Sequence, residues 1–354
     1  MKYLDTIEIK NFKSIRHQKI EGCKRINLFI GYPNVGKSNI LEALGLFSYL
    51  KYSDQPFELA DICRVKELAE LFFNQNYNEK GSVTLNERVI LEITMDDGLR
   101  LLGNFFDFNS NRPNGVSEFS SFQLRAQGEL SSVKNVSESE YATMISPVKK
   151  YTFKSGTEGK FATPKALRFP FGENLLALLQ GNAKLRMEVK ELFDLYELKL
   201  FLDPSAKSIN FFKELSDGTA IKVPYHQIAD TLQRLIFYKA AILTNSQKVI
   251  LFEEPEAHMF PPYIRKFTSE VMFDEGKNQY FIATHSPYVL ESFVEDAFED
   301  TSIYLVDYKN GETRINKLEL EELNEIRQYG VDLFFNLESY LKKRNVDDGT
   351  VGNA

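Results

Sequence analysis

Cysteine is scarce in this chain. Only Cys23 and Cys63 occur, and they lie far apart in the sequence. Sparse cysteine is typical of a protein from a reducing compartment. The first residues, Met1–Phe12, also lack the apolar core of a secretory signal peptide. We therefore expect a cytoplasmic protein.

Long apolar runs are missing as well. The runs Ile26–Ile30 and Val249–Phe252 are far shorter than the about 20 residues that cross a bilayer, so we expect no membrane contact. No internal repeat and no long heptad run is found. With 43% hydrophobic and 26% charged residues, the 354-residue chain has the composition of a globular protein with a large core.

Positive charge is in deficit, with a formal net charge of −7. A uniformly acidic surface repels phosphate backbones, which argues against a dedicated DNA-binding protein. A local basic stretch between residues 147 and 170 leaves DNA contact open, although a solvated loop has the same composition. Its basic residues are Lys149, Lys150, Lys154, Lys160, Lys165 and Arg168, with Glu158 as the acidic residue among them.

A phosphate-binding motif stands near the start of the chain. After two expected strands at Leu4–Ile9 and Ile26–Ile30, the segment Gly31–Ser38 reads GYPNVGKS and matches G-x-x-x-x-G-K-[ST]. Apolar residues at helical spacing follow it, so the backbone amides of the loop would converge on phosphates at a helix N-terminus. We predict that Lys37 bridges the β- and γ-phosphates and that Ser38 ligates Mg²⁺. The expected phosphate-site residues are Gly31, Asn34, Val35, Gly36, Lys37 and Ser38.

A second element is the apolar run Val249–Phe252, which ends in Glu253 and Glu254. Alone, such a run is typical of a strand that leads into a solvated loop. Beside a phosphate loop it predicts a parallel strand whose carboxyl end faces the ligand. We assign Glu253 to the metal and Glu254 to the attacking water.

A third apolar run, residues 279–283, is followed by Thr284, His285 and Ser286. A histidine is common at a strand end, and by itself it would indicate nothing more. In the order phosphate loop, acidic strand, histidine strand, we predict that His285 reaches the γ-phosphate.

The remaining chain suggests one α/β domain. We expect a nucleotide-binding core from residues 1–50 and 226–341, because strands and helices alternate there. Residues 83–128 alternate apolar and polar side chains and predict an antiparallel β-subdomain, with a turn at Asp97-Gly98. Residues 129–146 are expected to form an excursion, and 172–202 a helical lobe.

These motifs resemble the ABC-type P-loop ATPase heads of the RecF, SMC and OLD class, particularly the stand-alone ATPases of bacterial defence operons. The matching positions are Lys10–Ser14, Gly36–Asn39, Glu253–Glu256 and Thr284–Ser286. The resemblance covers most of the chain and is weakest between residues 50 and 220. It implies a mixed sheet with an antiparallel β-subdomain and a helical lobe.

The resemblance also implies residue roles. Lys13 and Asn39 would contact the nucleotide, Glu253 would be the Walker B carboxylate, Glu254 the catalytic glutamate and His285 the switch histidine. The cofactors implied are ATP and Mg²⁺, and the reaction is ATP hydrolysis. Glu253 replaces the Asp that is usual in the family, which suggests slow turnover.

Heads of this class pair head to tail, and a signature segment of one subunit completes the ATP site of the other. Leu215–Thr219 carries suitable letters, but its Asp-Gly is better interpreted as a hairpin turn. A later segment opens a helix at the usual distance before Glu253, and we prefer it. Its signature-like residues are Ala229, Asp230, Thr231 and Arg234.

We therefore expect an ATPase that forms a homodimer or higher homo-oligomer. No acidic metal cluster like the Toprim site of OLD nucleases follows His285, so the effector would be separately encoded, with a nuclease as one candidate. No long arms separate the motifs, which excludes an SMC-like clamp. The leading hypothesis is a switch that senses phage infection or DNA damage. The alternatives are a RecF-like repair ATPase that binds DNA and a scaffold that binds ATP with little turnover.

Overall fold

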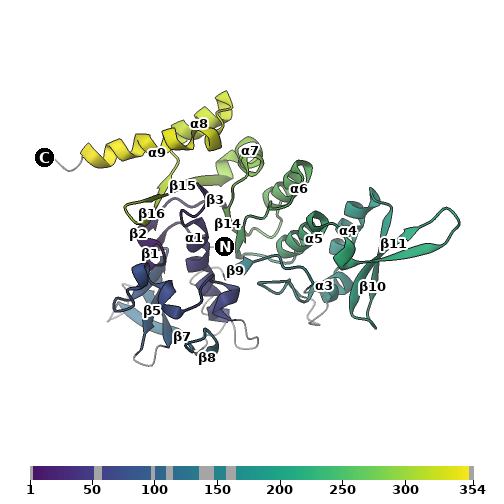
Figure 1. Ribbon diagram of the computed structural model, residues 1–354, viewed down its shortest axis with the longest axis horizontal. Helices are drawn as coiled ribbons and strands as arrows, with labels where there is room; N and C mark the ends of the chain where they lie inside the picture. The colour runs from purple at the N-terminus through teal and green to yellow at the C-terminus, as the bar shows by residue number, and fades with distance from the viewer. Residues whose placement is uncertain are drawn as a thin grey trace. The chain divides into compact units, whose positions relative to one another are not determined.

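The computed structural model describes residues 3–51, 58–96, 100–108, 115–134, 147–156 and 165–350 (Figure 1). The predicted turn at Asp97-Gly98 lies outside these residues. Contacts divide the chain into two compact units. Unit 1 comprises Met1–Lys149, Val249–Glu254 and Gln279–Ala354, and unit 2 comprises Lys150–Lys248 and Pro255–Asn278. The single-head division predicted from sequence stays a prediction.

Strands and helices occur in both units. The strands are β1 (Ile7–Phe12), β2 (Ile15–Ile20), β3 (Ile26–Ile30), β4 (Gly81–Leu85), β5 (Val89–Met95), β6 (Leu101–Phe108), β7 (Val116–Leu124), β8 (Leu130–Lys134), β9 (Val148–Tyr151), β10 (Leu198–Asp203), β11 (Ser208–Glu214), β12 (Ala220–Pro224), β13 (Val249–Glu253), β14 (Gln279–Ala283), β15 (Thr301–Lys309) and β16 (Glu312–Lys317). The helices are α1 (Lys37–Gly45), α3 (Leu175–Gly181), α4 (Ala183–Asp194), α5 (Asp230–Leu243), α6 (Pro261–Met272), α7 (Pro287–Asp296), α8 (Leu320–Tyr329) and α9 (Leu333–Thr350). Among the described residues, none of these helices combines the length and apolarity that a bilayer span requires.

The core of unit 1 is a six-stranded mixed sheet in the order β16-β15-β3-β14-β13-β9. β3 is parallel to β14 and β15, and β13 is parallel to β14, whereas β16 pairs antiparallel with β15. All residues of β3 and β14 are buried, as in strands that are covered on both faces. The helix α1 packs against β13 and β14. The predicted strands at residues 26–30 and 249–252 are therefore confirmed.

The second sheet of unit 1 is antiparallel and has the order β2-β1-β4-β5-β6-β7-β8. The antiparallel pairing predicted within residues 83–128 is confirmed by β5, β6 and β7. The excursion predicted at 129–146 is wrong at its start, because Leu130–Lys134 forms β8 and pairs with β7. Residues 135–146 lie outside the described part of the chain.

The first strand lies later than predicted, at Ile7–Phe12 in place of Leu4–Ile9. A tight hairpin joins it to β2, with Phe12 opposite Ile15 and Ile7 opposite Ile20. Lys13 in this turn has a left-handed φ of 49°. No glycine marks this turn, so the sequence alone does not predict β2.

Unit 2 contains α3 to α6 and a three-stranded antiparallel sheet, β10-β11-β12 (Figure 1). The helical lobe predicted at 172–202 is partly wrong. Helix α4 ends at Asp194, Glu197 has a φ of 57°, and residues 198–203 form β10. Leu198, Leu200 and Leu202 alternate with other residues at a period of two, which suits a strand paired with β11. Phe211 of β11 stacks on Phe193 of α4, with ring centroids 4.1 Å apart.

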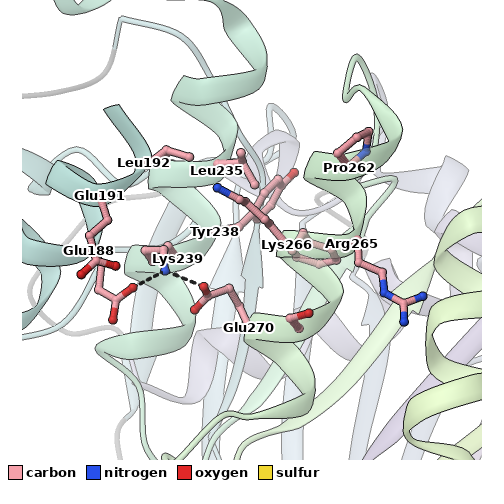
Figure 2. A pocket seen from close by; sticks show the side chains of 12 residues that line it. Glu188, Glu191, Leu192, Leu235, Tyr238, Lys239, Pro262, Arg265, Lys266 and Glu270 are labelled. Carbon is pink, nitrogen blue, oxygen red and sulfur yellow. Dashed lines mark hydrogen bonds and ion pairs between the residues drawn. The ribbon is translucent and has the colours of Figure 1, made fainter. Parts of the chain in front are cut away.

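Lys239 of α5 forms ion pairs with side chains of two other helices of unit 2 (Figure 2). Its ammonium donates to Glu188 of α4 at 2.7 Å and to Glu270 of α6 at 2.5 Å. Burial disfavours the charged form of Lys239, but the two carboxylates outweigh this effect and raise its pKa. These side chains line a cavity of about 310 Å³. The ion network therefore stabilises the packing of α4, α5 and α6.

Removing this cation should destabilise unit 2. We expect Lys239→Ala to lower the free energy of unfolding by about 1–3 kcal/mol, because two partly buried carboxylates lose their partner. Urea denaturation followed by circular dichroism measures the loss. The matched control, Lys184→Ala, removes an exposed ion pair with Glu275 and should cost at most about 1 kcal/mol. Equal losses for both variants would contradict the bridging role of Lys239.

Candidate nucleotide-binding site

The phosphate loop connects the end of β3 to the start of α1, as the sequence predicts. Gly36 caps the helix with a left-handed φ of 103° and, as a glycine, supplies no side-chain cap. A Cβ at Gly36 would lie 2.1 Å from Thr313 Oγ1 and 2.7 Å from Ser14 Oγ. Only glycine fits this position. The helix end therefore offers its amides to an anion.

Lys37 lies over the loop that precedes it. Its ammonium donates to the carbonyl oxygens of Gly31 at 2.9 Å and Tyr32 at 2.8 Å, and the residue is buried. Val35 is also buried, which anchors the loop, and Asn34 has a left-handed φ of 63°. The loop is thus closely wrapped around the Lys37 side chain.

Thr313 of β16, a strand distant in the sequence, stabilises the phosphate loop. Thr313 Oγ1 donates to the carbonyl oxygen of Val35 at 2.8 Å and lies 2.6 Å from Ser14 Oγ. Asn39 Nδ2 donates to the same Ser14 oxygen at 2.6 Å. The sequence motifs did not point to Thr313, because it stands in an unremarkable strand far along the chain.

Lys13, expected to face the nucleotide, is held by a buried carboxylate. Its ammonium forms an ion pair with Glu42 of α1 and donates to the carbonyl oxygen of Arg64 at 3.1 Å. Glu42 also accepts from the backbone N–H of Arg64 at 3.3 Å. Glu42 and Arg64 were not predicted from sequence, since neither belongs to a recognised motif. Both lie beside the phosphate loop in the same cavity.

The two adjacent carboxylates point in different directions. Glu253 ends β13, and its Oε1 accepts from Arg64 Nη2 at 2.6 Å. Glu254 has a left-handed φ of 42°, and its N–H donates to Ala283 O at 2.8 Å. Such a φ is uncommon for glutamate and often occurs at functional sites. The turn separates the two carboxylates predicted to serve metal and water.

His285 follows β14 and faces Glu254, with 3.5 Å between Nε2 and Oε1. Burial lowers the pKa of His285 below its usual 6.5, and the charge of Lys37 lowers it further, while Glu254 acts in the opposite direction. The imidazole is therefore mainly neutral at pH 7. The strand register explains why His285 and Glu254 lie close together, because Ala283 lies opposite both Glu253 and Phe29.

Many of these side chains line one cavity of unit 1, with a volume of about 510 Å³, but Glu253 is not among them. The volume suits a small-molecule ligand such as a nucleotide. Predicted residues on its wall are Lys13, Asn34, Gly36, Lys37, Ser38, Asn39, Glu254 and His285, with Ser14 from the matching segment Lys10–Ser14, while unpredicted ones include Glu42, Arg64 and Tyr308. The loop residues Gly31 and Val35 support it from below the surface, since both are buried.

A magnesium ion fits the donor set. Within the described ranges, no cluster of three or more His, Cys, Asp or Glu side chains could hold a metal alone. Ser38 offers a hydroxyl and Glu253 a carboxylate, which is the sparse protein contribution that Mg²⁺ uses when phosphates and water complete its octahedron. The assignment of these residues to the metal stays a prediction.

The signature-like residues belong to unit 2, at the start of α5. Ala229 and Asp230 are exposed, Asp230 pairs with Arg234 at 2.6 Å, and Thr231 Oγ1 donates to the carbonyl oxygen of His258 at 2.6 Å. Their signature role stays a prediction. The competing segment Leu215–Thr219 is a hairpin turn between β11 and β12, as predicted, with Leu215 N–H donating to Thr219 O at 2.8 Å.

Among the described residues of the basic stretch, Lys154 and Lys165 are exposed but Lys149 and Lys150 are not, so these side chains do not form one continuous exposed patch. Lys149 and Lys150 lie in β9 and are only 7% and 3% exposed. Arg168 Nε lies 3.8 Å from Glu173 Oε2, and the ammonium of Lys154 lies over the ring of Phe171. Lys160 and Glu158 lie outside the described residues. The sequence could not reveal this burial, because the lysines occupy β9, the edge strand of the six-stranded sheet.

Known proteins resemble this chain over long stretches. Residues 26–291, more than half of the chain, match the family described as "AAA domain, putative AbiEii toxin, Type IV TA system". The DNA replication and repair protein RecF of Thermoanaerobacter sp. (strain X514) is 30% identical over 97 residues, 24% of this chain and 27% of RecF. The Septu protein PtuA of Bacillus mycoides (strain KBAB4) is 23% identical over 312 residues, 83% of this chain and 40% of PtuA. The chain thus spans less than half the length of these two relatives.

A solved structure shows the same fold. The crystal structure of the SmcHead bound to the C-winged helix domain of ScpA matches with a TM-score of 0.52 and 17% identity, covering 92% of this chain and 100% of that chain. The predicted fold class, an α/β P-loop head with a mixed sheet, an antiparallel β-subdomain and a helical lobe, is confirmed. Its fold is thus that of an SMC head, and the chain belongs to the family described as "AAA domain, putative AbiEii toxin, Type IV TA system".

Proposed function

We propose that this chain is a cytoplasmic switch ATPase that binds ATP with Mg²⁺, hydrolyses it slowly and controls a separately encoded effector. The observation that carries the ATPase part is the convergence of Lys37, Glu254 and His285 on one cavity of about 510 Å³. The family description, which includes a toxin and a Type IV toxin–antitoxin system, supports a role beside an effector. The trigger would be phage infection or DNA damage.

Each residue of the site has a chemical task in this proposal. The loop amides and Lys37 would bind the phosphates, and Ser38 and Glu253 would hold Mg²⁺, which would neutralise phosphate charge. Glu254 orients the attacking water and accepts its proton. His285, neutral at pH 7, can donate one hydrogen bond toward the γ-phosphate without adding a charge beside Lys37.

Assembly is proposed to proceed through two ATP sites of paired chains. The exposed start of α5, with Ala229 and Asp230, would meet the nucleotide of a second copy. Alanine and threonine stand where the class usually has signature serine and glycine, so one hydroxyl contact to the γ-phosphate is lost. Loss of such a contact costs about 1–3 kcal/mol, which supports slow turnover.

Two other functions remain as alternatives. Similarity to RecF favours DNA binding, which would be ATP-dependent and salt-sensitive. The burial of Lys149 and Lys150 counts against the basic stretch as its contact surface. A scaffold that binds ATP with little turnover is favoured by Ala229 and Thr231, and it differs from a switch ATPase in its response to Glu254 substitution.

Glu254→Gln should strongly reduce ATP turnover but leave ATP binding intact. Without the carboxylate that accepts the proton, we expect steady-state ATPase activity to fall about 10²–10⁴-fold. Light scattering should show ATP-stabilised dimers of this variant, whereas Lys37→Ala should bind no ATP and stay unassembled. Glu321→Gln, on the exposed face of α8, is the matched control and should behave as wild type. Unchanged, low turnover in Glu254→Gln would favour the scaffold.

The imidazole of His285 should titrate below pH 6.5. NMR of the side-chain resonances, assigned with His285→Asn, measures the midpoint. Lys37→Ala removes a positive charge that disfavours the imidazolium, so the midpoint should rise. Glu254→Gln removes the opposing negative charge, so the midpoint should fall further. Midpoints that do not respond to either change would contradict the electrostatic coupling of the three residues.

The effector should bind this chain and should be encoded by a neighbouring gene. We expect the protein encoded by the adjacent gene to copurify with this chain, and its retention to differ between ATP-loaded Glu254→Gln and Lys37→Ala. Size-exclusion chromatography of the two purified proteins measures the complex. Separate elution in both nucleotide states would contradict control of that partner.

A further inference from the structure

The carboxylate assigned to the metal already has a cation beside it. Arg64 Nη2 donates to Glu253 Oε1 at 2.6 Å. The side chain of Glu253 is 10% exposed, whereas that of Arg64 is 72% exposed. The largely buried carboxylate of Glu253 is therefore held at the end of β13, and its partner is the exposed guanidinium of Arg64.

The backbone of Arg64 is anchored at both of its polar atoms. Its N–H donates to Glu42 Oε1 at 3.3 Å, and its carbonyl oxygen accepts from Lys13 at 3.1 Å. Glu42 and Lys13 form an ion pair with each other, and the neighbouring Cys63 is fully buried. This clamp fixes where the Arg64 side chain starts but leaves its exposed guanidinium able to change partner. Glu42 and Lys13 are thus positioning residues for Arg64.

We propose that Arg64 is a resident counter-ion of Glu253 that competes with the divalent metal for this carboxylate. A guanidinium and a metal ion on the same carboxylate repel each other, so each weakens the binding of the other. Metal loading should therefore weaken the contact between Arg64 and Glu253. This inference rests on the proposed function, since it uses Glu253 as the metal ligand.

The competition would couple metal and nucleotide loading to the segment that carries Arg64. While Arg64 stays on Glu253, the carboxylate is neutralised and the metal is disfavoured. Once the metal binds, the guanidinium is released into a cavity whose wall it already lines. Resting and loaded states of the site then differ by the partner of one arginine.

Manganese binding in the presence of inorganic tripolyphosphate tests the proposal without any turnover. The polyphosphate supplies the phosphate ligands that the site lacks, and electron paramagnetic resonance should show about tenfold tighter Mn²⁺ binding for Arg64→Ala than for wild type, because a charged hydrogen bond no longer competes. The matched control, Arg125→Ala, removes another exposed arginine that pairs with a glutamate, Glu129, at 3.5 Å and should match wild type. Adding Glu253→Gln to Arg64→Ala should abolish the gain.

Two results would overturn the counter-ion role. One is equal Mn²⁺ affinity in wild type and Arg64→Ala, and the other is a gain that persists when Glu253→Gln is added. ATP binding of the wild type is measured on the same samples. A gain that depends on Glu253, in a protein that binds no ATP, would uphold the counter-ion role and overturn the proposed ATPase function instead.

Discussion

The parallel pairing of β3, β14 and β13 is the constraint on which the site depends. Ala283 lies opposite Phe29 on one side and Glu253 on the other, so three strands end at one edge of the sheet. Parallel strands place their carboxyl ends together, and ligands bind there. A slip of one residue in either pairing would turn these side chains to the other face. The phosphate loop, the carboxylates and His285 meet because this register is fixed by fully buried strands.

A second constraint is the support of the phosphate loop from outside its own motif. Thr313 of β16 donates a hydrogen bond to the loop and also lies against Ser14. A residue late in the sequence and one near its start therefore meet beside Gly36. A small residue is required at Gly36 for this reason as well as for its left-handed backbone. The loop is thus held in the shape that presents amides to an anion before any ligand arrives, which reduces the cost of ordering it on binding.

Charge inside the site is balanced by pairs. The buried Glu42 matches Lys13, Glu253 matches Arg64, and Glu254 opposes the effect of Lys37 on the pKa of His285. Charges with partners cost less to bury than isolated ones. In the proposed function, a phosphate chain would bring several negative charges to these pairs and would compete for their cations.

The sequence by itself determined the phosphate loop, the acidic strand and the histidine strand, because each is a local pattern of an apolar run followed by specific polar residues. It also predicted the hairpin at Leu215–Thr219 from Asp-Gly alone. It failed where neighbours in space decide: at β10, whose strand depends on pairing with β11, and at Lys149 and Lys150, which the core sheet buries. Only the tertiary structure brought Arg64, Glu42 and Thr313 to the site, because their contacts join segments that are distant in the chain and leave no local pattern.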